Sequence, residues 1–211
     1  MGAGGKQQWA VIVPLKPLDS GKSRLGAEAR RSELALAFAR DVVTAALACP
    51  GVAEVVVVTD DPRATAVLRS DGARVVSDVG QGLNAAFEHG ATAARIRTPD
   101  IGLVALAGDL PALTSDELHR ALTQAWDRRR CYVADADGVG TSMLTARPGI
   151  GLNASFGVGS SDEHLASGAY LLDVDDCPGL RRDVDTPADL EAVIALGVGV
   201  ATAAVLTPPE S

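Results

Sequence analysis

The sequence is poor in cysteine and has no long hydrophobic run. Its three cysteines, Cys49, Cys131 and Cys177, lie far apart and form no C-x-x-C pair, which argues against a zinc site or a disulfide framework. A sparse, odd count suits a protein of the reducing cytoplasm, where such thiols are buried as small apolar side chains. No apolar stretch reaches the roughly 18 residues of a membrane span, so we expect no membrane-spanning segment.

Positive charge is also scarce. The 19 Lys and Arg residues are outnumbered by 27 Asp and Glu residues, and the formal net charge is -8. This balance argues against a protein that binds nucleic acid or a membrane surface. Residues 1–8 lack the apolar core of a signal peptide, and we expect them and the tail 207–211 to be disordered.

Short apolar runs alternate with longer, alanine-rich segments of helical period. We predict strands over 9–13, 54–61, 73–78 and 101–109, and helices over 33–48, 62–72, 83–95 and 115–130. This alternation predicts a Rossmann-like, three-layer α/β fold, in which helices cover both faces of a mostly parallel sheet.

After Cys131 the rhythm changes to shorter segments that are broken by glycine. We expect a hairpin or irregular strand pair over 131–146, a glycine-serine loop over 156–161, a strand over 169–176 and a last helix over 187–197. No internal repeat or long linker interrupts the 211 residues. We therefore predict a single domain over residues 1–211, with a smaller irregular β segment in its second half.

The loop after the first strand is unusually cationic. Residues 21–23 resemble the end of a phosphate-binding P-loop, but Lys16 stands where that motif requires a glycine. Lys16, Lys22, Arg24 and two further arginines lie within residues 14–31, against only two acids. Ligands of open α/β sheets bind at the carboxyl ends of strands, so we favour phosphate binding here over a solvated loop without a ligand.

Three aspartates are placed to share a divalent cation. Asp109 closes an apolar strand, where a carboxylate can hold a cation that bridges phosphate oxygens, although an aspartate often simply starts a turn there. Asp183 and Asp185 alternate on a short extended segment and so face one side. A capping box over 186–189 explains the next helix but neither of these acids. We expect all three to bind Mg²⁺. Which of Asp183 and Asp185 is the direct ligand of the ion is left open.

Hydroxyl groups and glycines gather in the irregular second half. Thr141, Gly157 and Ser160 offer hydroxyls and backbone N–H groups, which are the donors that a phosphate or carboxylate needs. Ordinary turns have a similar composition, so both interpretations stay open at this point. We expect His164, which follows them, to be structural rather than catalytic.

The segment 80–85 fits the glycine fingerprint of a dinucleotide-binding fold. That fingerprint normally belongs to the first strand-helix unit and is followed by an acid that ends the next strand. Here it follows at least two strands, and Asp100 precedes the next strand instead of ending it. We therefore reject binding of NAD, while Asn84 remains a candidate contact to a base or ribose.

Taken in order, these motifs resemble the guanylyltransferases of deazaflavin coenzyme F-420 biosynthesis, which join GMP from GTP to phosphoenolpyruvate or 2-phospho-L-lactate. The resemblance covers nearly the whole chain, through VIVPLKPLDSGKSRL, GLNAA, LAGDLPAL, GVGTSML, FGVGSS and RDVDTPADL. It departs from the family pattern at Val139 and at Val158-Gly159.

The resemblance implies a role for each motif. Catalysis would rest on Lys22 and Asp109, nucleotide binding on Lys16, Lys22, Arg24 and Asn84, metal binding on Asp109, Asp183 and Asp185, and binding of the phosphorylated three-carbon acid on Thr141, Gly157 and Ser160. Both departures lie in the expected acid pocket, so the sequence leaves the choice between phosphoenolpyruvate and 2-phospho-L-lactate open.

The expected reaction is an in-line attack of the acid's phosphate on the α-phosphorus of GTP, with release of pyrophosphate. Positioning and charge neutralisation by Mg²⁺, lysine and arginine supply most of the rate of such reactions. We therefore predict a cytoplasmic guanylyltransferase that acts on GTP and phosphoenolpyruvate; a homodimer is left open. The alternatives are a nucleotidyltransferase for the molybdenum cofactor or a sugar phosphate, or a non-catalytic domain that binds a nucleotide as a regulator.

Overall fold

The apolar strands of the sequence form a seven-stranded sheet in the computed structural model, which describes residues 8–20 and 28–207. The strands are β1 (Trp9–Pro14), β2 (Val52–Val58), β3 (Arg74–Val76), β4 (Gly102–Leu106), β5 (Arg130–Ala134), β6 (Thr141–Ala146) and β7 (Tyr170–Leu171). Their spatial order is β3-β2-β1-β4-β6-β5-β7. The pairs β1–β2, β1–β4, β2–β3 and β5–β7 are parallel, which confirms the mostly parallel sheet.

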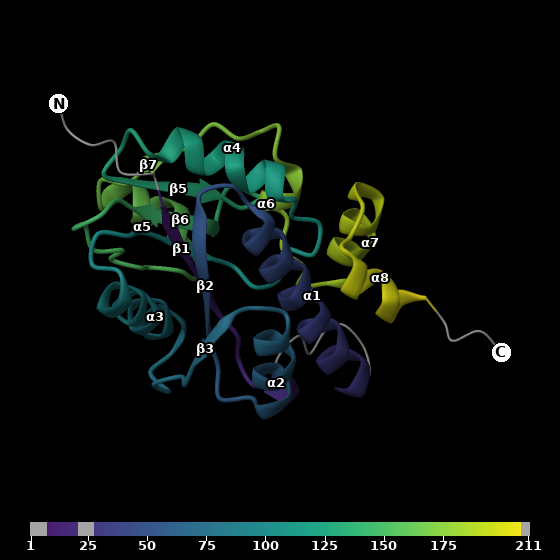
Figure 1. Ribbon diagram of the computed structural model, residues 1–211. Coiled ribbons are helices and arrows are strands. Elements are labelled where there is room, and N and C mark those ends of the chain that lie inside the picture. Colours follow the sequence, from purple (N-terminus) through teal and green to yellow (C-terminus); the bar gives the residue numbers. More distant parts are fainter. Residues whose placement is uncertain (1–7, 21–27, 208–211) are drawn as a thin grey trace.

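Helices surround this sheet (Figure 1). They are α1 (Glu28–Ala48), α2 (Pro62–Ser70), α3 (Leu83–Arg97), α4 (Ser115–Ala125), α5 (Ser160–Ala166), α6 (Pro178–Arg181), α7 (Pro187–Leu196) and α8 (Val200–Leu206), with a 3-10 turn over Leu18–Ser20. None of the helices in the described part of the chain is long and apolar enough to cross a membrane.

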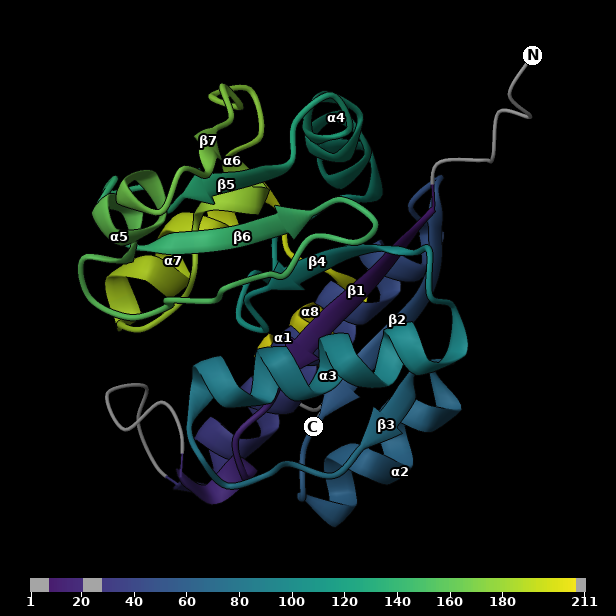
Figure 2. The ribbon, with the colours of Figure 1, turned by 90° about the vertical axis from the view of Figure 1, so that its left-hand side faces the viewer.

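Alternate residues of β1 supply two separate cores, one on each face of the sheet. Val11 and Val13 pack with α1, α2 and α4 on one face, whereas Ala10 and Ile12 pack with α3 on the other. Figure 2 shows α3 in front of the sheet and α1 behind it. A Cβ atom at Gly90 of α3 would overlap the side chain of Ile12, so glycine lets this helix approach β1 closely. The predicted three layers are thereby confirmed.

One strand runs against its neighbours. β6 pairs antiparallel with both β4 and β5, and Met143 lies opposite Leu106 at the end of β4. β5 and β6 thus form the hairpin that the sequence predicts over 131–146. Because β6 is reversed, its first residue, Thr141, lies at the edge where β1 and β4 end.

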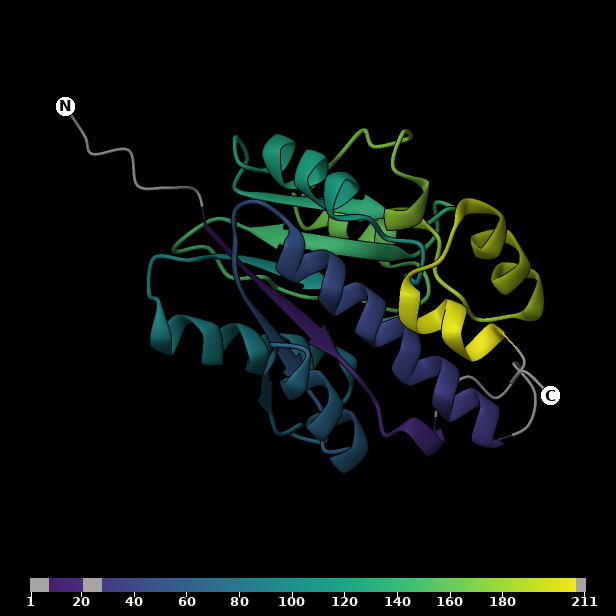
Figure 3. The same ribbon diagram turned by 45° about the vertical axis from the view of Figure 1, so that its right-hand side comes forward.

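The C-terminal helices α7 and α8 lie beside α1 (Figure 3). Val184 and Val193 pack against Leu34 and Phe38 of α1 in a third apolar cluster. The carboxylate of Asp41 accepts hydrogen bonds from the backbone N–H groups of the first turn of α8, each at 2.9 Å. A residue of α1 therefore caps a helix that begins about 160 residues later in the chain.

Several element predictions were wrong in extent. The predicted loop over 156–161 ends in α5, and neither α6 nor α8 was predicted. The predicted strand over 169–176 keeps only two residues in β7, because after Leu172 the chain leaves the sheet and turns, with the N–H of Cys177 bonded to the carbonyl of Val174. Of the tails 1–8 and 207–211, for which we expected disorder, Gln8 and Thr207 are placed by backbone hydrogen bonds to Gly102 and Ala203. Residues 1–7 and 208–211 lie outside the described residues.

Candidate active site

A cavity of about 680 Å³ opens at the carboxyl ends of β1 and β4. It brings together seven of the predicted site residues, namely Lys16, Asp109, Thr141, Gly157, Ser160, Asp183 and Asp185. They come from three regions: the ends of the first parallel strands, the β5–β6 hairpin with the loop before α5, and the segment before α7. Lys22 and Arg24, from which we expected phosphate contacts, lie outside the described residues.

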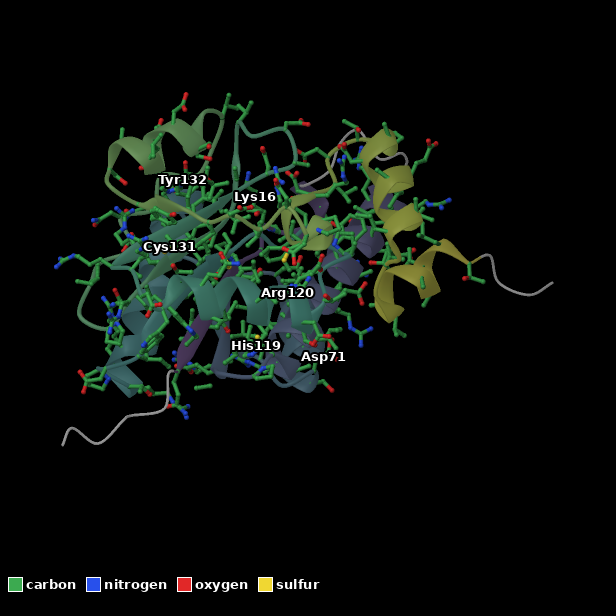
Figure 4. The ribbon with its side chains drawn as sticks, turned by 90° about the horizontal axis from the view of Figure 1, so that it is seen from above. Lys16, Asp71, His119, Arg120, Cys131 and Tyr132 are labelled. Atoms are coloured by element: carbon green, nitrogen blue, oxygen red, sulfur yellow. The ribbon has the colours of Figure 1, made fainter. Side chains whose placement is uncertain are left out.

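The loop that carries Lys16 is fixed to the neighbouring strand and helix. The N–H of Leu15 donates to the carbonyl of Val58, and the N–H of Leu18 donates to the Asp61 carboxylate at 3.0 Å. Burial opposes ionisation of Asp61, but backbone N–H donors outweigh it and lower the pKa of this carboxyl group. Lys16 itself is exposed and lines the cavity. In Figure 4 it lies well apart from the labelled His119.

All three predicted metal ligands line the cavity. Asp109 follows β4, and its carbonyl accepts a hydrogen bond from the N–H of Val184 at 3.1 Å. Val184 is completely buried, so the residues on either side of it, Asp183 and Asp185, face away from the core and line the cavity. The capping box predicted at the start of α7 is present, with Thr186 and Asp189 bonded to each other.

Two further acids line the cavity, and sequence reasoning did not single them out. Asp135 accepts hydrogen bonds from the N–H groups of Val139 and Gly140, at 2.9 and 2.7 Å, and so closes the loop between β5 and β6. Asp137 lies in the same loop. The sequence signal for this loop is Asp-Ala-Asp-Gly at residues 135–138, a composition typical of a turn, directly after an apolar strand.

The cavity has an acidic lining. Five aspartates, Asp109, Asp135, Asp137, Asp183 and Asp185, face one cation, Lys16, among the described residues that line it. The site therefore combines room for a ligand of nucleotide size with several carboxylate side chains.

Hard carboxylate oxygens are the ligands that Mg²⁺ prefers, so the cavity lining supplies the right type of ligand atom for this ion. Within residues 8–20 and 28–207, no three His, Cys, Asp or Glu side chains are grouped closely enough to hold a metal ion together. Mg²⁺ commonly takes only one or two carboxylates and completes its shell with water and substrate phosphates. The arrangement meets that smaller requirement, and a site shared by all three predicted aspartates stays a prediction.

Asn84 does not line the cavity but holds one of its walls. Its side-chain amide donates to the carbonyl of Phe156 at 3.1 Å and accepts from the N–H of Phe156 at 2.7 Å. Phe156 in turn stacks on Phe87 of α3, with ring centroids 4.3 Å apart. The contact that we predict between Asn84 and a base or ribose stays a prediction. The observed hydrogen bonds show that this side chain also fixes the backbone of Phe156.

The loop before α5 contains two glycines, of which Gly157 lines the cavity. Gly157 has φ 139° and Gly159 has φ 79°, backbone conformations that disfavour residues with a Cβ atom. Ser160 begins α5 directly after them, and its hydroxyl donates to Thr141 Oγ1 at 3.1 Å. The two predicted hydroxyls, separated by 19 residues in the chain, thus touch at the cavity wall.

His164 supports these hydroxyls from behind. It is completely buried, and its Nδ1 lies 2.9 Å from Thr141 Oγ1. Burial, with a contribution from the charge of Arg130, lowers the pKa of His164 to about 4. The imidazole is therefore neutral at physiological pH, in agreement with the structural role that we expect for it.

The sequence matches known proteins over almost its full length. A family model described as guanylyl transferase CofC like matches residues 9–207. A protein of Thermomonospora curvata named phosphoenolpyruvate guanylyltransferase is 50% identical over 199 residues, which cover 93% of this chain and 87% of that relative. A relative of the same name from Streptomyces coelicolor is 50% identical over 202 residues, with 94% and 95% covered.

Solved structures share the fold at lower identity. A nucleotidyl transferase from Methanothermobacter superposes with a TM-score of 0.64 at 21% identity and covers 90% of this chain and 97% of its own. A protein of Mycobacterium tuberculosis, solved in complex with manganese, gives a TM-score of 0.58 at 22% identity, with 90% and 100% covered. At these identities the likeness establishes the fold alone.

Proposed function

The chain belongs to the family of CofC-like guanylyl transferases, and from this premise we propose that it transfers GMP from GTP to phosphoenolpyruvate, with release of pyrophosphate. It is a nucleotidyltransferase, and the family connects it with coenzyme F-420 biosynthesis. One observation supports this cavity of about 680 Å³ as the site of the reaction. Lys16, the aspartates and the two hydroxyls line it together at the edge of the sheet where ligands of such folds bind.

In the proposed reaction an oxygen of the acid's phosphate forms a bond to the α-phosphorus of GTP. The bond between that phosphorus and the oxygen bridging to the β-phosphate breaks, and pyrophosphate leaves with the electron pair. The attacking phosphate is already ionised, so no side chain has to remove a proton. The protein contributes position and charge, which is the main source of rate in phosphoryl and nucleotidyl transfer.

Each wall of the cavity has a part in this proposal. The ammonium group of Lys16 neutralises phosphate charge, together with Lys22 and Arg24 of the opening loop. Thr141, Ser160 and the backbone at Gly157 hold the acid by hydrogen bonds. Asp109, with Asp183 or Asp185, would hold Mg²⁺, which would offset the negative charge of the phosphates.

The charge of the two substrates supports the requirement for a divalent cation. GTP and the acid are both polyanions, and the carboxylates that line the cavity offer the oxygen ligands that Mg²⁺ prefers. We further propose a cytoplasmic location, because all three cysteines are buried free thiols.

Pyrophosphate release tests the proposal directly. The protein is incubated with GTP and Mg²⁺ and with phosphoenolpyruvate, 2-phospho-L-lactate, a hexose phosphate or no acceptor. We expect release that depends on the three-carbon acid and is fastest with phosphoenolpyruvate. Release with the hexose phosphate alone would contradict the proposed acceptor, and GTP binding without release for any acceptor would favour a regulatory domain. Omission of the divalent cation is expected to abolish release.

A further inference from the structure

Both ring nitrogens of His164 are used, and their partners determine where the proton lies. The backbone N–H of Ser155 donates to Nε2 at 3.1 Å. Because an amide N–H can only donate, Nε2 carries a lone pair. A neutral imidazole has one proton, which must then be on Nδ1, where it is donated to Thr141 Oγ1 at 2.9 Å.

The surroundings of the ring keep it neutral and fixed. The guanidinium of Arg130 lies on the same side of the sheet and donates to the carbonyl of Asn153 at 3.1 Å and to Ser167 Oγ at 2.9 Å. The hydroxyl of Ser167 donates to the carbonyl of His164 at 2.7 Å. A nearby positive charge and complete burial both disfavour a protonated imidazole.

The position of this proton decides what the cavity presents to a ligand. Thr141 and Ser160 have two hydroxyl hydrogens between them, and the bond that joins their oxygens uses one. If His164 donates to Thr141, the second hydrogen stays available to a ligand. If His164 instead accepted through Nδ1, Thr141 would donate to the ring and Ser160 to Thr141, and both hydrogens would be consumed.

We propose that His164 is a positioning residue for the acid subsite: by donating from Nδ1 to Thr141, it leaves one hydroxyl hydrogen of the Thr141–Ser160 pair for an anionic oxygen of the acid. This inference rests on the proposed function for the identity of the ligand. It goes beyond it by giving a second role to a buried residue that does not line the cavity. The imidazole transfers no proton in the reaction.

Substitutions test whether His164 acts through Thr141. In His164→Leu we expect KM for phosphoenolpyruvate to rise roughly 10- to 100-fold, as for a lost hydrogen bond to a charged group, with KM for GTP changed less than about threefold. His164→Asn can still donate to Thr141 from its amide and is expected to regain most of the affinity. Leu165→Ala, an exposed neighbour on α5, is the matched control and should match the wild type.

A double-mutant cycle separates positioning from general support of the fold. Thr141→Val removes the hydroxyl while keeping the shape, and the same rise in KM is expected. If His164 acts through Thr141, the double variant Thr141→Val/His164→Leu loses no more than Thr141→Val alone. Additive losses, or equal losses in His164→Leu and His164→Asn, would overturn the proposal.

The proton itself can be located without any turnover. Nitrogen-15 NMR of histidine-labelled wild-type protein distinguishes a protonated from an unprotonated ring nitrogen. We expect His164 to carry its proton on Nδ1 at neutral pH, and a proton on Nε2 would overturn the proposal even if every variant failed to fold. If the wild type releases no pyrophosphate with any acid, the proposed function is wrong, while the NMR result still decides the position of the proton.

Discussion

The N–H of Val184 donates to the carbonyl of Asp109 across 3.1 Å, although 75 positions separate the two residues in the chain. This bond joins the end of β4 to the segment before α7. It therefore places two acid-bearing segments of distant origin on one wall of the cavity. Both the chemistry and the stability of the protein are expected to depend on it.

Replacement of Asp109 by asparagine tests the carboxylate alone. The side chain keeps its size but loses the charge that would hold Mg²⁺, so we expect kcat to fall about 10²- to 10³-fold, as when an electrostatic contribution to the transition state is removed. Steady-state pyrophosphate release over a Mg²⁺ titration measures the effect. Asp127→Asn, at an exposed position, should keep normal activity. Full activity in Asp109→Asn would remove Asp109 from the metal site.

Val184→Ala tests the link between the core and the acids. Val184 is completely buried in the cluster with Leu34 and Phe38, so the cavity left by the lost methyl groups should lower the free energy of unfolding by about 1–3 kcal/mol. Loosening of Asp183 and Asp185 should also reduce kcat at a temperature where the protein is folded.

Urea unfolding and pyrophosphate release measure the two effects separately. Val200→Ala, whose side chain is 87% exposed, supplies the comparison and should leave both unchanged. Normal kcat in a destabilised Val184→Ala would mean that the two aspartates do not need this anchor.

Asn84→Ala tests whether the Asn84 amide contributes to binding of the acid or of GTP. It removes both hydrogen bonds to the backbone of Phe156, so the loop that leads to Gly157 should lose its position. We expect KM for the acid to rise roughly 10- to 30-fold, in line with the loss of two partly buried hydrogen bonds that each contribute about 1 kcal/mol. Initial-rate kinetics with each substrate varied measure the change.

A rise confined to KM for GTP would instead support the predicted contact to a base or ribose. Ile96→Ala, at an exposed position on the same helix, is the control.

Mild acid should destabilise the protein through His164. Its pKa is lowered from 6.5 to about 4 in the folded state, so the unfolded chain binds a proton more readily. The stability due to the neutral ring is complete above the unfolded pKa and is lost as the pH falls from about 6.5 toward 4. We expect unfolding to become about 2–3 kcal/mol easier at about pH 4.5 than at about pH 7.5.

Urea unfolding at the two pH values measures this loss, and His164→Asn, which has no group that titrates there, isolates it. The variant should lose less stability on acidification than the wild type. Equal losses in both proteins would show that other groups, such as the aspartates, dominate acid unfolding.

Periodicity was enough to predict the parallel half of the fold. Val11 and Val13 alternate with Ala10 and Ile12, and such a run, apolar on both faces, is typical of a strand covered on both sides. The family resemblance drawn from six motifs is likewise confirmed by the family and sequence matches. Local turn chemistry predicted the capping box at Thr186 correctly, because all of its partners lie within four residues.

The missed elements depend on partners far away in the chain. α8 has no side-chain cap of its own and is capped by Asp41 of α1, which no local pattern reveals. α5 is only seven residues long, too short for a helical stripe to show. The hydrogen bonds of Asn84 to Phe156 were not predicted either, because the two residues are 72 positions apart in the chain.

The reversal of β6 has a consequence for how this enzyme could change its acceptor. Thr141 reaches the rim because the strand enters from that side, and the β5–β6 hairpin needs no crossover helix to do so. The residues after β1 and β4 that we propose to bind GTP therefore lie on other segments of the chain than the hydroxyls that we propose to bind the acid. Exchange of residues 130–166, which include His164, between relatives should transfer the preference for the acceptor and leave recognition of the nucleotide unchanged.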